Sequence, residues 1–185
     1  MDWKFQFSYA VFGKVSHAQL SILVSDAHTM EVTANQWIEQ QSELIPICAL
    51  NDSRHSASLK ELIAARRDIL GSNREAMLWL RIGLIERPHD IVQSATNGIP
   101  AYIHGVVHRL EGDYWNANYW FRRVGNSALI EDIASAVSQH GNVDSFDPTD
   151  FTNQVEAWNR SKDSAKSAEL QRIATQEWEA LWAML

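Results

Sequence analysis

Apolar residues recur at helical spacing along most of this chain, in stripes separated by capping and breaking residues. One stretch ends before Pro46, because proline lacks the amide hydrogen that a helix interior needs, and another is closed by Gly71. The pattern predicts helices over residues 33–44, 58–70, 72–85, 88–96, 100–111, 114–124, 127–140 and 167–185. We therefore predict an all-α fold of antiparallel helical hairpins.

The first dozen residues fit two patterns. Phe5, Phe7 and Tyr9 alternate as in a strand, whereas Trp3, Phe7 and Val11 recur as in a helix. The structure of this segment stays open.

The length of 185 residues is typical of one domain with a substantial core, so residues 1–185 are expected to form a single helical domain. Within it, residues 1–70 form N-terminal helices, residues 74–125 a hairpin core and residues 126–185 C-terminal helices. Residues 141–149, GNVDSFDPT, read as the best internal linker.

Composition and charge limit the function classes. The net charge of −7 disfavours nucleic acid as a partner, and no window has the roughly 18 uncharged apolar residues of a membrane span. The first residues lack the basic and apolar regions of a secretory signal, which predicts a cytoplasmic protein. Cys48 is the one cysteine and lies in an apolar run, so we expect a buried thiol and no internal disulfide.

Residues 101–124, AYIHGVVHRLEGDYWNANYWFRRV, place small residues, a turn and an aromatic ring at particular positions. Gly105 and Ala117 are small residues in successive helices, Gly-Asp-Tyr forms the turn, and Phe121 is the aromatic. This combination resembles one helical hairpin of the tetratricopeptide repeat family. The resemblance implies an irregular tetratricopeptide-like bundle or a short solenoid. His104 and His108 depart from the repeat, which usually has leucine and an aromatic there, and no copy at a fixed period follows.

The overlapping stretch HRLEGDYWNANYWFRRVG resembles a second family, of uncharacterised bacterial and fungal proteins with the pattern HRxEGDYxNAxYWFRRxG. The later FDPTDF and QEWEALW fit the same resemblance, which covers about residues 75–185. It implies no activity.

His104, His108 and Glu111 are four and three residues apart, which places them on one face of a helix. Three such groups could hold a divalent cation with open coordination positions. Alternatively, both imidazoles lie in the core, bonded to a backbone carbonyl or to Asp113. We favour this alternative, without a metal or other cofactor, because the spacing lacks the additional acid of a zincin motif.

The helix expected at 114–124 carries aromatic residues on several faces, which predicts that it is buried between layers or lines a cleft. Arg122 and Arg123 must then reach water, a carboxylate or an anionic ligand. Pairing with an acidic residue, or stacking on Trp120, is the structural interpretation, and an anion clamp is the functional one. The candidate ligand-binding residues of the two helices are His104, His108, Arg109, Glu111, Asp113, Tyr119, Arg122 and Arg123.

Two hypotheses for the function follow. The first is a helical interaction or scaffold module whose hairpins bind a protein or peptide partner, or a second subunit in a homo-oligomer; it rests on the hairpin and on the excess of tryptophan, eight residues. The second is a small-ligand or metal-dependent enzyme with its site on residues 100–124. The sequence has no glycine-rich phosphate loop, paired-cysteine metal motif or nucleophile elbow.

Overall fold

The fold is given by a computed structural model that describes residues 34, 36–38, 45–50, 56–141 and 143–185. The chain divides into two compact units, Met1–Gln40 and Gln41–Leu185. In the first unit the described residues are helical, and Ala34 and Trp37 are buried. The alternatives for the first dozen residues, and most of the helix expected at 33–44, lie outside the described residues. The single-domain organisation stays a prediction.

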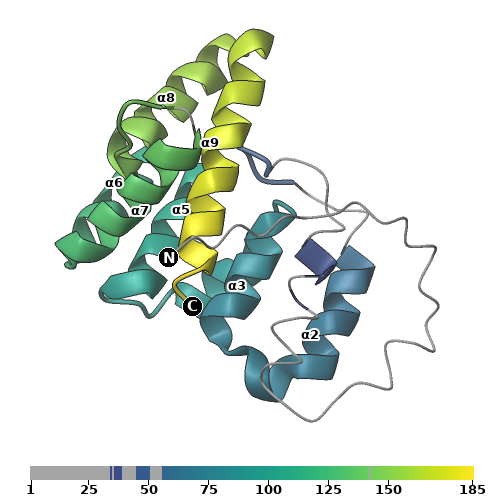
Figure 1. Cartoon of the computed structure of the whole chain (residues 1–185). Helices are drawn as coiled ribbons and strands as arrows, with labels where there is room; N and C mark the ends of the chain where they lie inside the picture. Colours follow the sequence, from purple (N-terminus) through teal and green to yellow (C-terminus); the bar gives the residue numbers. More distant parts are fainter. Residues whose placement is uncertain (1–33, 35, 39–44, 51–55, 142) are drawn as a thin grey trace, which may run out of the picture. The chain divides into compact units, whose positions relative to one another are not determined.

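The described part of the second unit consists of helices joined by short connections (Figure 1). They are α2 (Ser56–Leu70), α3 (Ser72–Arg81), α4 (Glu86–Val92), α5 (Gly98–Glu111), α6 (Tyr114–Arg123), α7 (Ser127–Gly141), α8 (Pro148–Ser161) and α9 (Ser164–Trp182). No strand occurs within the described ranges, so the all-α prediction is confirmed. None of the helices described is long and apolar enough to cross a membrane.

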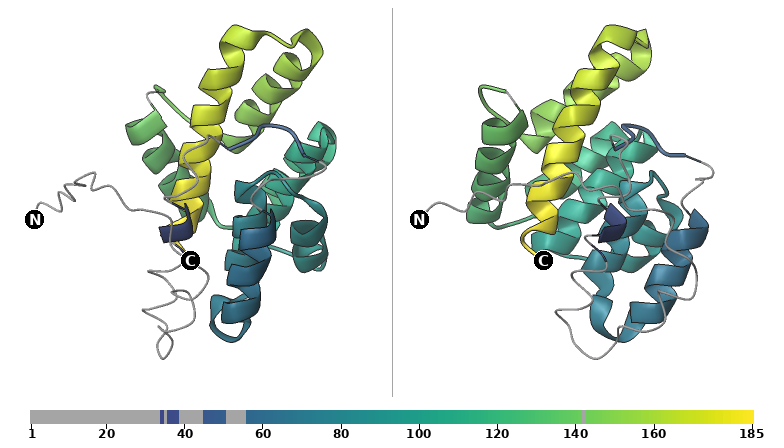
Figure 2. Two further views of the ribbon diagram at one scale, coloured as in Figure 1. Left: turned by 90° about the vertical axis from the view of Figure 1, so that its right-hand side faces the viewer. Right: turned by 45° about the vertical axis from the view of Figure 1, so that its right-hand side comes forward.

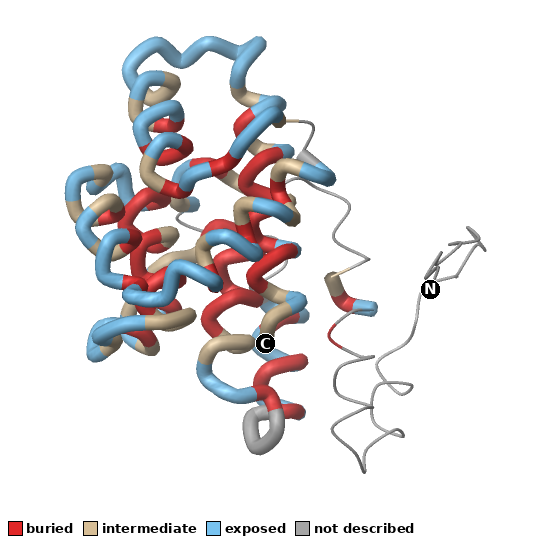
Figure 3. The backbone as a smooth tube through the Cα atoms, turned by 60° about the vertical axis from the view of Figure 1, so that its left-hand side comes forward, coloured by how far each residue is buried: buried red, intermediate tan, exposed pale blue. Residues whose placement is uncertain are grey.

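The core of this unit is built around α9, against which α3, α7 and α8 pack (Figures 1 and 2). The apolar stripe predicted for the last helix is buried, with Leu170, Ile173 and Leu181 nearly inaccessible to solvent. The indole Nε1 of Trp178 donates a hydrogen bond of 2.7 Å to the carbonyl of Met77, which ties α9 to α3. Figure 3 shows the buried residues along the sides of the helices that face one another.

Helix α8 was not predicted, because its apolar stripe is short, with Phe151 and Val155 as its buried apolar side chains after Pro148. Its start is fixed by Asp147, whose carboxylate accepts hydrogen bonds from the amides of Thr149 (2.8 Å) and Asp150 (3.0 Å). The linker expected at 141–149 is therefore only a short connection between α7 and α8.

Two boundaries also differ from prediction. The helix expected at 72–85 ends at Arg81, and Gly83 follows with a positive φ of 77° that favours glycine. Helix α4 then begins at Glu86, so Pro88 lies in its first turn, where its missing amide hydrogen costs no hydrogen bond.

The prediction of a buried Cys48 is wrong, because its side chain is exposed. The segment 45–50 is not helical, and it turns Ile45 and Ile47 inward while Cys48 faces solvent. This segment is held by hydrogen bonds from the amide of Ala49 to the carbonyl of Leu110 and from Leu50 to Gly83, both 2.9 Å.

Candidate functional site

Helices α5 and α6 form a tight antiparallel hairpin that positions the candidate site. Gly112 ends α5 with a positive φ of 86°, and the carboxylate of Asp113 caps α6 by accepting a hydrogen bond from the amide of Asn116 (3.2 Å). The two helices approach where Gly105 faces Phe121: a Cβ atom on Gly105 would lie 2.7 Å from Cε1 of that ring. Only glycine fits there, and the close approach brings the polar and aromatic face of α6 against α5.

Three imidazoles meet beside this hairpin, those of His89, His104 and His108, which we call the histidine triad. One ring nitrogen of each lies within 4.8 Å of the others. His104 and His108 stack one turn apart on α5, with ring centres 4.7 Å apart, whereas His89 comes from α4 and meets both rings edge-on at 5.1 and 5.3 Å. His104 and His108 are buried and His89 is half-buried, so solvent reaches the triad from the α4 side.

His104 lies at the inner end of the triad. Its ring stacks on Trp120 with centres 4.1 Å apart, and its buried Nδ1 atom has no hydrogen-bond partner. Burial, followed by the neighbouring imidazoles of His108 and His89, lowers the pKa of His104 from 6.5 to about 4. The ring is therefore neutral at pH 7, the state in which imidazole coordinates a metal ion.

His108 contacts two polar side chains. Its Nδ1 lies 2.7 Å from Oε2 of Glu111, and the side-chain nitrogen of Asn116 lies 3.1 Å from Nε2 and 3.5 Å from Nδ1. Nδ1 can donate to the Glu111 carboxylate, whereas the Asn116 nitrogen, close to both ring nitrogens, does not lie along the lone pair of either. The partners suggested by the sequence, a backbone carbonyl or Asp113, are not those that the structure shows.

Arg109, a candidate ligand-binding residue, lies in the core. Its guanidinium forms a buried ion pair with Glu177 of α9 and lies 4.6 Å from the centre of the Phe151 ring. The hydroxyl of Tyr102 donates to Oε1 of Glu177 at 2.7 Å. Burial, followed by the Glu177 carboxylate, raises the pKa of Tyr102 well above its ordinary value. Because this network satisfies its own charges, the small apolar pocket lined by Arg109 and Glu177 offers no free charged group.

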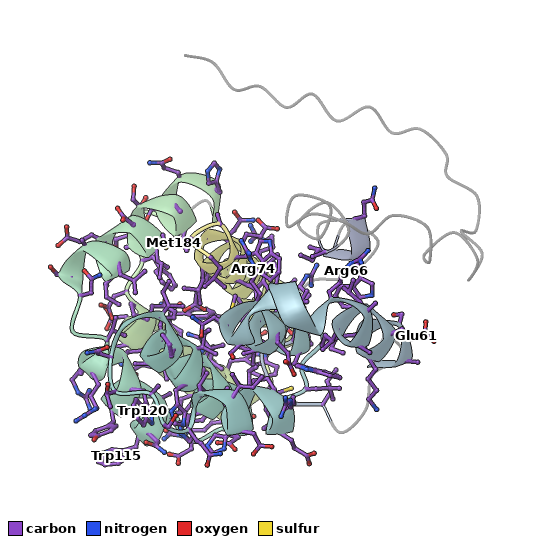
Figure 4. All side chains as sticks on the ribbon, turned by 90° about the horizontal axis from the view of Figure 1, so that it is seen from below. Glu61, Arg66, Arg74, Trp115, Trp120 and Met184 are labelled. Carbon is purple, nitrogen blue, oxygen red and sulfur yellow. The ribbon has the colours of Figure 1, made fainter. Side chains whose placement is uncertain are left out.

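The other candidates of α6 face solvent. Trp115 and Tyr119 are exposed, at 75% and 37% of their surface, and their rings stack 6.1 Å apart. In Figure 4 Trp115 lies at the periphery of the side chains, and Trp120 lies closer to the helices. The guanidinium of Arg123 covers the rings of Tyr119 (5.4 Å) and Trp120 (5.9 Å), as the structural interpretation expected. Helix α6 thus has one exposed side and is not enclosed between layers.

Sequence reasoning brought together His104, His108 and Glu111 but missed His89 and Asn116. His89 lies in α4 and Asn116 in α6, so both join the site only because these helices pack against α5. A usable signal was present: three histidines within 20 residues, on consecutive helices expected to be neighbours.

Comparisons with protein-family models, with curated proteins and with solved structures gave no match for this chain. The resemblances to the tetratricopeptide hairpin and to the HRxEGDYxNAxYWFRRxG family therefore stay predictions.

Proposed function

We propose that this protein binds a divalent transition-metal ion through the histidine triad. The observation that carries the proposal is the convergence of three imidazoles, each with one ring nitrogen within 4.8 Å of the others. In addition, the buried Nδ1 of His104 has no hydrogen-bond partner. A buried polar atom without a hydrogen bond costs about 1–3 kcal/mol, and a metal ion coordinated by that nitrogen would give it a partner.

The geometry requires only a small closure. Zinc–nitrogen bonds of about 2.0–2.1 Å in a tetrahedral site place neighbouring nitrogens about 3.4 Å apart. The triad nitrogens lie within 4.8 Å of one another, so side-chain rotations that shorten these distances by up to about 1.4 Å suffice. The half-buried His89 has the most room to move.

Glu111 supports this function, whereas Asn116 lies where it would hinder metal binding. The hydrogen bond from Nδ1 of His108 to Glu111 leaves Nε2 to face the ion, as in the carboxylate–histidine–metal arrangement of known sites. The side-chain nitrogen of Asn116 lies 3.1 Å from that Nε2 and would have to move aside on binding. Imidazole ligands favour zinc, copper, nickel or cobalt over magnesium or calcium, which prefer oxygen.

The test is Zn²⁺ binding to the full, untagged chain, measured by calorimetry after treatment with a chelator. We expect one ion per chain in the wild type, and binding weakened by more than about 100-fold in His89→Ala, since even residues behind the ligands contribute 10- to 100-fold. His89→Ala is preferred because its side chain is only half-buried. His140→Ala, at an exposed position of α7, is the matched control.

A wild-type protein that is folded by circular dichroism and binds no zinc would contradict the proposal. Equal binding by wild type and His89→Ala would place the metal elsewhere.

A second candidate function is recognition of an acidic peptide by the exposed side of α6. Trp115 and Tyr119 present stacked rings to solvent, and Arg122 has no ion pair within the described residues. Tryptophan, tyrosine and arginine dominate the binding energy of protein interfaces. A short segment with a carboxylate beside an apolar side chain would satisfy both features.

The probe for this candidate is a fluorescent peptide of alternating aspartate and leucine, with a lysine–leucine peptide as its counterpart. We expect binding of the acidic peptide alone, weakened at least about tenfold in Trp115→Ala and in Arg122→Gln. Arg172→Gln, at an exposed position of α9, is the control. Equal binding of both peptides, or binding indifferent to the α6 substitutions, would remove this candidate.

A further inference from the structure

The histidine triad supplies no negative charge to a metal ion. Imidazole coordinates in its neutral form, so a divalent ion bound there would bring two positive charges next to two buried side chains, His104 and His108. Charge buried without compensation is unfavourable, and a metal site normally balances it with carboxylates or with an external anion.

Glu111 is the one carboxylate in direct contact with the triad among the described residues, and it occupies the wrong side of the ring. Its Oε2 bonds Nδ1 of His108. The two nitrogens of an imidazole point away from each other, so a carboxylate on Nδ1 cannot also coordinate an ion on Nε2 of the same ring. Glu111 therefore orients His108, and it offsets the charge of the metal ion only across the imidazole ring.

The surroundings of the triad add positive charge. The Trp120 ring lies against His104, and the guanidinium of Arg123 lies over that same ring, 5.9 Å from its centre. Arg123 has ring contacts but no ion pair within the described part of the chain. The Trp120 ring thus links the triad to a cationic side chain that has no ion pair within the described residues.

We infer that the metal-loaded triad binds a small monovalent oxyanion, of which acetate is the simplest, at its open coordination position. Three protein ligands leave at least one position of a tetrahedral ion free. The anion replaces a metal-bound water molecule without any transfer of electrons. This inference rests on the proposed function, since without the metal the triad has no cationic centre.

The experiment uses the full chain loaded with Co²⁺, whose visible absorption reports the ligands of the ion. We expect acetate to change the spectrum in a saturable way, and acetamide, its neutral counterpart of similar shape, to leave the spectrum unchanged. Arg123→Gln should weaken acetate binding about threefold while Co²⁺ affinity stays the same, because it removes a charge that acts through space.

Glu111→Gln distinguishes the source of the fourth ligand. If the protein's own carboxylate filled the position, acetate would act only on this variant, and the inference would be wrong. A bound Co²⁺ whose spectrum ignores acetate in both proteins would likewise overturn the inference and leave the proposed function intact. A folded chain that fails to bind Co²⁺ and Zn²⁺ would overturn both.

Discussion

Replacing Gly105 with alanine tests the close approach of α5 and α6 that shapes the site. The added Cβ would lie 2.7, 2.8 and 2.9 Å from three carbon atoms of the Phe121 ring, against ordinary contacts of 3.4 Å or more. The ring has little room to move, because it is 4% exposed and packs 5.0 Å from the ring centre of Tyr102. Overpacking of this kind costs about 1–3 kcal/mol.

Alanine also improves helix propensity by up to about 1 kcal/mol, which offsets part of that cost. We therefore expect Gly105→Ala to lower the free energy of unfolding by about 1–2 kcal/mol, and the midpoint of thermal unfolding by roughly 2–8 °C for a chain of this size. Urea denaturation followed by circular dichroism measures the first quantity, and differential scanning calorimetry measures the second.

A double-mutant cycle isolates the cause. In a Phe121→Leu background the smaller side chain makes room for the new methyl group, so Gly105→Ala should be neutral or stabilising there, by up to about 1 kcal/mol. If Gly105→Ala leaves the wild-type background as stable as before, or destabilises both backgrounds equally, the contact between the two helices does not require glycine.

Three further predictions concern the charged and polar groups. In the metal-free protein, the pKa of His104 near 4 means that the unfolded chain binds more protons between pH 4 and 6.5. The neutral His104 ring contributes on the order of 2–3 kcal/mol to the free energy of unfolding above pH 6.5, and this contribution is lost as the pH falls toward 4. His104→Gln should flatten this pH dependence, measured by urea titrations in the presence of a chelator. A pH profile shared by both proteins would contradict this. Glu177→Gln should lower the free energy of unfolding by about 3–5 kcal/mol, because it leaves Arg109 buried without a counter-charge. Tyr102→Phe should lower it by only about 1–2 kcal/mol. Thermal unfolding ranks the two variants, and the reverse order would refute the assigned network. Asn116→Ala should preserve zinc affinity or tighten it by up to about tenfold in calorimetry, since its amide crowds Nε2 of His108, and weaker binding would instead make Asn116 part of the site.

The position of each helix was largely readable from local patterns. The stripe Leu170, Ile173, Trp178 and Leu181 repeats at helical spacing, and one buried face follows directly from that period. Gly112 and Asp113 signalled the α5–α6 turn for an equally local reason: only a few residue types adopt a left-handed backbone or cap a helix. Helix α8 was not predicted, because a short apolar stripe gives a weak periodic signal.

What the sequence determined by itself was therefore the helical class, the α5–α6 hairpin and the alignment of His104 and His108 on one face, because all three depend on residues a few positions apart. The tertiary structure alone decided the rest of the site. Packing of α4 against α5 places His89 beside the other two imidazoles. Arg109 lies in the core because it pairs with Glu177 of α9, 68 positions further along the chain. Nothing in the local pattern of these segments encodes either contact.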